Sequence, residues 1–215
     1  MNLKKKLTLF VLSLFLAAPV AAQDVPGISS VGVKGGLSLA SLNADNTDFS
    51  YDAGLTGGIY GQIGFTPTIS PRAELLYVQK GGVIENLSPN NEDRAYSLNY
   101  IEIPVLAKVN VPVVRQVFPS LYLGPYIGFA VSRSITEDGD DVSGLNPEDQ
   151  FNTTDYGLAI GTDVDFSFAG RNLVLSARYD WGLANILADG ASLPNVDTSE
   201  EIGTSTFMIT LGAGL

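Results

Sequence analysis

Apolar and polar side chains alternate with a period of two along most of the chain. In the stretch LVLSARYDWGLANI, residues 173–186, Leu175, Tyr179 and Trp181 take odd positions, whereas Arg178 and Asp180 take even ones. A period of two is the signature of a β-strand, whose successive side chains point to opposite faces. No segment keeps a 3.6-residue period, and the chain has 23 glycines, so the pattern excludes a helical fold.

Eight segments share this alternation, and most have the about 9–11 residues with which a tilted strand crosses a bilayer. They are residues 31–40, 53–65, 71–80, 98–110, 120–133, 154–168, 172–183 and 204–215. The pattern therefore predicts an all-β fold of eight antiparallel strands, which can close into a soluble lipocalin-like barrel or into a membrane barrel.

The polarity of the two strand faces decides between these barrels. One face of every segment is nearly free of charge and carries bulky apolar side chains, while the other combines glycines with charges. The charged positions are Lys34, Glu74, Lys80, Glu102, Lys108, Asp163, Asp165, Arg178 and Asp180. Small and charged residues suit a narrow lumen and bulky apolar ones suit lipid, so we predict an up-and-down transmembrane barrel. Its lumenal charges should pair, with Glu74–Lys108 and Glu102–Lys80 as the expected cross-strand pairs.

The connections alternate between short and long. The short ones contain TPTISP, VPVVRQVFP and AGRN, and the four long ones hold sixteen Asp and Glu but one basic residue, Arg94. Short periplasmic turns and long external loops are the arrangement of outer-membrane barrels. Aromatic residues on the apolar face fall where the two interfacial girdles should lie. They are Tyr77, Tyr156, Tyr179, Trp181 and Phe207 toward the loops, and Phe65, Phe166 and Phe168 toward the turns.

The N-terminus predicts export. MNLKKK is a basic stretch, LTLFVLSLFLAA is an apolar stretch too short to span a bilayer as a helix, and PVAA supplies small residues before Gln23. We therefore expect residues 1–22 to be a cleaved signal peptide and residues 23–215 to form the barrel domain in the outer membrane of a Gram-negative cell. Cleavage removes three lysines, so the formal net charge of −11 becomes −14.

Several stretches together resemble a known family. RAELLYVQKGG, LNYIEIPVLAKVN, LYLGPYIGFAVS and LSARYDWGLANI occur in this order, and the resemblance covers nearly the whole mature chain. They are similar to the PorT-like outer-membrane β-barrel proteins. This resemblance implies an eight-stranded barrel and, from the founding member, a link to protein secretion at the cell surface. The chain departs from the usual aromatic end of such barrels because it ends in Leu215.

The residue inventory argues against catalysis. The chain contains no histidine and no cysteine, which removes the side chains that most often serve as general base, thiol nucleophile and metal ligand. The stretch TEDGDD offers Asp138, Asp140 and Asp141 as a weak calcium candidate, but the order of ligands in an EF-hand is missing. We expect no cofactor, and an acidic rim repels nucleic acid.

Two functions remain open at this point. The first is a non-enzymatic interaction, assembly or secretion-associated surface protein, whose partners are outer-membrane lipid, the barrel-insertion machinery and an envelope or secretion-system protein. The second is a narrow channel or transporter for small solutes. Eight strands leave an interior that side chains can fill, which favours the first.

Overall fold

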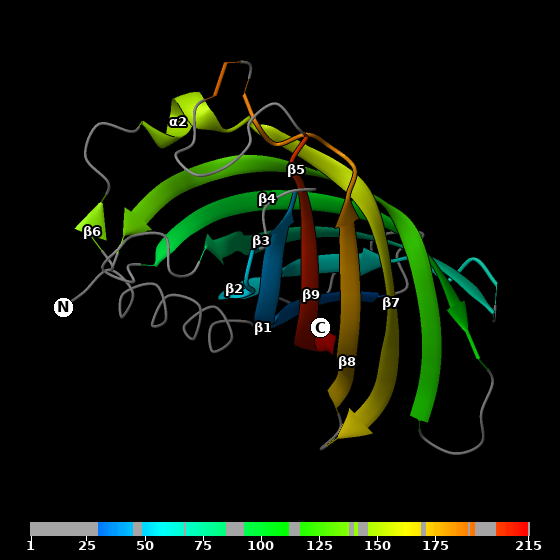
Figure 1. Cartoon of the computed structure of the whole chain (residues 1–215). Helices are drawn as coiled ribbons and strands as arrows, with labels where there is room; N and C mark the ends of the chain where they lie inside the picture. Colours follow the sequence, from blue (N-terminus) through cyan, green and yellow to red (C-terminus); the bar gives the residue numbers. More distant parts are fainter. Residues whose placement is uncertain are drawn as a thin grey trace.

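The alternating segments form long strands in the computed structural model of the chain (Figure 1). The described residues are 30–44, 49–66, 68–84, 93–111, 117–137, 140–141, 146–168, 171–188, 190–191 and 201–214. The predicted signal peptide and Leu215 lie outside them. The elements are β1 (Ser30–Asn43), β2 (Asp52–Gln62), β3 (Ile69–Ile84), β4 (Arg94–Asn110), β5 (Val117–Glu137), β6 (Asp140–Asp141), α2 (Pro147–Gln150), β7 (Thr154–Phe168), β8 (Arg171–Gly182) and β9 (Gly203–Gly214).

Eight of these strands close into one antiparallel barrel within the described part of the chain. Each strand pairs with the next one along the sequence, with β5 followed by β7, and β9 pairs back with β1. The two-residue β6 only extends the far end of β5. We call the end with the long connections the loop end and the opposite end the turn end. The predicted up-and-down fold is thereby confirmed.

The main difference from the predicted elements is the length of β3, β4 and β5. Residues 81–84, 94–97 and 134–137, expected in loops, continue these strands beyond the rest of the barrel (Figure 1). The β4–β5 register also shifts between Asn99 and Tyr100, so that Val131 has no partner on β4. This bulge changes which side of β5 faces inward, and Ile135 becomes buried although it shares odd numbering with exposed Ile127. The four-residue helix α2 in the third long connection was not expected either.

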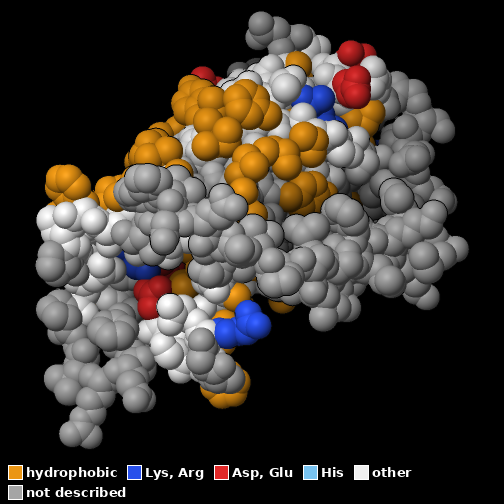
Figure 2. Space-filling view, turned by 180° about the vertical axis from the view of Figure 1, so that it is seen from behind, with side chains coloured by type: hydrophobic (Ala, Val, Ile, Leu, Met, Phe, Trp, Pro, Cys, Tyr) orange, Lys and Arg blue, Asp and Glu red, His pale blue; other side chains and the backbone are white. Residues whose placement is uncertain are grey.

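Side chains separate by polarity on the two sides of the barrel wall. Along β8 the odd positions are exposed or half-buried, whereas Val174, Ser176, Arg178 and Asp180 are buried. Large apolar residues on the other strands are exposed in the same way, and they gather into a broad hydrophobic surface (Figure 2). Leu121, for example, is 62% exposed. An apolar outer surface over a polar interior is the arrangement that lipid, rather than water, stabilises.

Small residues make room for large ones inside the barrel. A side chain at Gly161 would place its Cβ 2.4 Å from the hydroxyl oxygen of Tyr122 and 2.5 Å from the carbonyl oxygen of Ala177, so only glycine fits there. The Tyr122 ring packs with Leu106, Tyr126 and Ala159 in one apolar cluster of the interior.

Among the described residues, no helix has the length and hydropathy to cross a membrane.

Candidate functional site

The lumen gathers the charges that share the inward face of the strands. Eight of the nine predicted lumenal charges are buried, and the ninth, Asp165, has a side chain that is one third exposed. Each of the nine makes at least one ion pair with another charged residue. The alternation of the strands explains this, because every second side chain of a closed narrow barrel must point inward.

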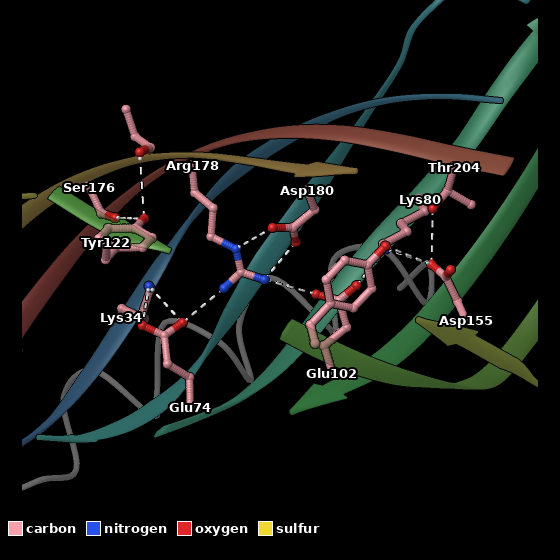
Figure 3. Close-up of polar contacts among 12 residues, drawn as sticks. Lys34, Glu74, Lys80, Glu102, Tyr122, Asp155, Ser176, Arg178, Asp180 and Thr204 are labelled. Carbon is pink, nitrogen blue, oxygen red and sulfur yellow. Dashed lines mark hydrogen bonds and ion pairs between the residues drawn. The ribbon is translucent and has the colours of Figure 1, made fainter. Parts of the chain in front are cut away.

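Arg178 on β8 is the centre of this network (Figure 3). Its Nη1 donates to Glu74 Oε2 at 3.0 Å, and its Nη2 donates to Glu102 Oε2 at 3.2 Å. Its Nε and Nη2 donate to the two oxygens of Asp180 at 2.7 and 2.6 Å. One guanidinium therefore holds carboxylates from β3, β4 and β8, and its planar fork is suited to such bidentate contacts.

A second group of charges continues from Glu74 toward the turn end. Lys34 Nζ lies 3.0 Å from Glu74, and the Nη1 of Arg72 lies 3.6 Å from Glu74 and 2.6 Å from Asp163. Lys108 then joins Asp163, at 3.1 Å, to Asp165, at 2.7 Å. These contacts link four strands, β1, β3, β4 and β7, across the lumen and end near the turn-end mouth.

A third group extends from Glu102 toward the loop end. Lys80 Nζ lies 2.5 Å from Glu102 and 2.9 Å from Asp155, and it sits 4.5 Å from the centre of the Tyr126 ring. Asp155 also accepts hydrogen bonds from the hydroxyls of Thr204 and Tyr126 at 3.0 and 3.3 Å. Ion pairs thus run without a break from Asp165 near one end of the barrel to Asp155 near the other.

The two predicted cross-strand pairs had different outcomes. Glu102 and Lys80 do pair. The prediction for Glu74 and Lys108 was wrong, because Lys108 lies opposite Ser70 and its ammonium reaches across to β7 instead. The sequence analysis also missed Arg72 and Asp155. The alternation of the strands could have placed both side chains in the lumen. Arg72 lies an even number of residues from Glu74 on β3, and Asp155 lies an even number of residues from Asp163 on β7.

The loop end of the lumen is covered by an apolar cluster that we call the loop-end cap. It consists of Leu42, Tyr96, Leu98, Tyr100, Ile135, Phe151, Ile186, Leu187 and Ile202. Phe151, Ile186, Leu187 and Ile202 come from the long connections rather than from strands. Phe49 and Phe151 pack edge-on against Tyr96, with ring centres 6.0 and 6.2 Å away. Burial raises the pKa of the Tyr96 hydroxyl, which keeps it neutral at physiological pH.

The predicted aromatic girdles lie on the outward parity of the wall. Tyr156, Tyr179, Trp181 and Phe207 are exposed near the loop end, and Phe65 and Phe168 are exposed near the turn end, while Tyr77 and Phe166 are half-buried. The side chains of the calcium candidates Asp138, Asp140 and Asp141 lie outside the described residues. Within the part that is described, no group of three or more Asp or Glu side chains is placed to hold a metal ion.

Comparison with known proteins identifies a family. The family model for the outer membrane protein β-barrel domain matches residues 21–188, and no curated protein matches the sequence. Solved structures with a similar fold include Ail, the attachment invasion locus protein of Yersinia pestis, at 13% identity and a TM-score of 0.42, covering 86% of this chain and 98% of Ail. Neisserial surface protein A has 15% identity and a TM-score of 0.47, with 87% and 99% covered. OprG of Pseudomonas aeruginosa has 11% identity and a TM-score of 0.45, with 86% and 95% covered.

Proposed function

Since the chain belongs to the family of outer membrane protein β-barrel domains, we propose that it is a non-conducting outer-membrane protein that acts through its loop-end surface. Its role would be the binding or assembly of an envelope partner rather than catalysis or transport. The long loops would face the cell exterior, the short turns would face the periplasm, and the mature chain would begin at Gln23 after export.

The observation that carries this proposal is the filled lumen. Side chains of Lys34, Glu74, Arg178, Glu102 and Lys80 are all at most 5% exposed, and their ion pairs span the barrel interior. Opening a water-filled path would separate these pairs and would also displace the loop-end cap. A narrow channel, the alternative function, requires both rearrangements and is therefore the less supported one.

The loop-end cap supports an interaction role. Phe151 and Ile186 are buried at 2% and 0% exposure although they belong to connections, so these parts of the loops pack onto the barrel mouth. The extended ends of β4 and β5 contribute Tyr96 and Ile135 to the cap. A surface that is already ordered binds a partner with a smaller loss of conformational entropy than flexible loops would.

The resemblance to PorT-like proteins supports a secretion-associated role within this proposal. The runs ELLYVQKGG, NYIEIP and GPY, which carry the resemblance, meet in the lumen. Lys80 of the first run contacts Glu102 of the second at 2.5 Å and the hydroxyl of Tyr126, from the third, at 3.5 Å. The three runs that carry the resemblance therefore meet in one contact inside the barrel. This favours a plugged lumen as a feature that the chain shares with PorT-like proteins.

Crosslinking in native cells tests the proposal. A photo-crosslinking amino acid replaces Tyr51, which is 71% exposed at the loop end, or Ile103, which is 40% exposed in the apolar belt, as the control. We expect one discrete protein adduct from position 51 and none from position 103. The adduct should disappear when Phe151→Ser disrupts the cap, while the barrel stays intact on an unboiled gel.

Two results would count against this function. Equal adducts from both positions would show that the loop end has no special partner. Regular conductance steps from the purified protein in a planar bilayer would support the channel instead.

A further inference from the structure

The turn end of the barrel contains a cavity of about 340 Å³. Its wall includes Tyr60, Gln62, Arg72, Asp165 and Val174. At about 30 Å³ per water, this volume corresponds to roughly ten water molecules. It is within the range of small-molecule sites, although at the lower limit. We call it the turn-end pocket.

The pocket is closed at its inner end. Beyond Tyr60 and Arg72 the lumen is occupied by Lys34, Ser176 and Thr210, and no space for a water molecule remains between them. Deeper still, Lys34, Glu74 and Arg178 are joined by ion pairs. A molecule in the pocket would therefore enter and leave through the same turn-end mouth.

Tyr60 supplies a polar group with no partner in the described part of the chain. The residue is only 5% exposed, and its ring lies 5.0 Å from the Arg72 guanidinium. Its hydroxyl makes no hydrogen bond to any residue that the structure describes, and Tyr60 lines the pocket. This hydroxyl is not among the fully buried unpaired polar atoms of the described residues, so it reaches the open space of the pocket and can bind an atom there.

Arg72 presents one edge of its guanidinium beside Tyr60. Its Nη1 is engaged by Asp163, but Nε and Nη2 both donate to the same oxygen, Oε1 of Gln62, at 3.2 and 2.9 Å. Gln62 is a neutral, half-buried amide. A carboxylate accepts two parallel hydrogen bonds from such an edge, and charge makes them stronger than those to an amide. A ligand carboxylate can therefore replace the Gln62 oxygen.

Asp165 adds the opposite charge to the same wall. Its Oδ2 accepts from Lys108 at 2.7 Å, while its Oδ1 makes no hydrogen bond within the described residues. Its side chain is one third exposed, unlike the buried carboxylates deeper in the lumen. The pocket thus offers donors in Tyr60 and Arg72 and a negatively charged acceptor in Asp165. An anion alone would be repelled by Asp165, and a cation alone would be repelled by Arg72.

We propose that the turn-end pocket binds a small zwitterion of the size of a free amino acid. Its carboxylate is held by the Tyr60 hydroxyl and the outer edge of Arg72, and its ammonium is held by Asp165. Val174, whose side chain points inward, supplies an apolar surface for the remainder of the ligand. This inference is independent of the loop-end function, since the pocket lies at the opposite end of the barrel.

Binding to the refolded mature protein in detergent tests the site. The probes are L-alanine, propionate, which has only the negative charge, and ethylammonium, which has only the positive charge. Calorimetric titration should show saturable binding of L-alanine and markedly weaker binding of both single-charge probes. Tyr60→Phe removes one hydroxyl that has no described partner, so it should fold normally and weaken L-alanine binding by about three- to tenfold.

Two further variants separate the site from general damage. Tyr156→Phe, an outward-facing tyrosine that is 53% exposed, should bind L-alanine like the parent protein. Asp165→Asn should weaken L-alanine and leave propionate unchanged or tighter. Unboiled gel mobility verifies that each variant is closed.

Three results would overturn the proposal. The first is no saturable binding of L-alanine. The second is equal affinity for L-alanine and propionate, which would indicate a plain anion site. The third is binding only after residues 23–28 are deleted, which would show that the chain itself occupies the pocket.

Discussion

Replacing Arg178 by methionine should destabilise the barrel strongly, because it removes the cation that three carboxylates share. Arg178 is 2% exposed, and Glu102 and Asp180 are fully buried. After the substitution, Glu74 keeps Lys34 and Glu102 keeps Lys80. Among the described residues, Asp180 makes its ion pair and its hydrogen bonds with Arg178 alone, and it loses them. The charge left without a partner is therefore that of Asp180.

The expected loss of stability follows from the ion-pair partners that each carboxylate keeps or loses. Breaking a buried ion pair by removing one partner costs about 3–5 kcal/mol, because the remaining charge stays desolvated. We expect a loss of this size from Arg178→Met. Adding Asp180→Asn removes the orphaned charge and should recover about half of the loss, roughly 2 kcal/mol. Arg171→Met, at the exposed start of β8, is the matched control and should change stability by no more than about 0.5 kcal/mol.

Urea unfolding in detergent micelles measures these differences. The fraction of closed barrel is read from the mobility of unboiled samples, and the emission of the single tryptophan, Trp181, gives an independent signal. If Arg178→Met unfolds at the same urea concentration as Arg171→Met, the lumen is hydrated and its charges are screened by water. If the double variant is less stable than Arg178→Met, the orphaned Asp180 is not the cause of the loss.

Other regions give further expectations. Ile103→Lys should cost about 2–4 kcal/mol in lipid vesicles, because the side chain lies in the apolar belt, and an unchanged unfolding midpoint would show that position 103 faces water. Lys80→Ala and Glu102→Ala should each destabilise the barrel, whereas the double variant should lose less than their sum in a double-mutant cycle; additive losses would contradict the pair. Phe151→Ala should speed hydrogen exchange in the loop-end cap without changing gel mobility, and unchanged exchange would place Phe151 outside a stable core. Cell fractionation should recover the protein with outer membranes and N-terminal sequencing should start at Gln23; recovery in the soluble periplasm would refute the topology.

The strands and their two faces could be predicted from the sequence because both follow from one periodicity. A strand that separates lipid from a filled lumen alternates at every residue, so the parity of Arg178 and Asp180 sets the side to which they point. Most predicted strand boundaries were within a few residues of the observed ones. The exceptions are the loop-end parts of β3, β4 and β5, where the strands continue beyond the apolar belt into residues that alternation had assigned to loops.

Partners across the lumen could not be predicted from parity. Arg178 contacts Glu74 and Glu102, which are 104 and 76 residues away in sequence and belong to strands that are not its neighbours. The face of a residue is a local property, whereas its partner depends on the width of the barrel and on register. The loop-end cap was missed for a related reason, since the bulge at Val131 turns Ile135 inward against the simple alternation.

Lipid contact at Trp181 tests the central claim most directly, because it uses the unmodified protein. Trp181 is the single tryptophan, is 56% exposed, and lies at the loop-end edge of the apolar belt. In vesicles of lipids brominated on their acyl chains near the headgroup, we expect strong quenching of its fluorescence and little quenching by iodide in the water phase. Strong quenching by iodide with none by brominated lipid would show that the apolar belt does not face the membrane, and the account would be wrong.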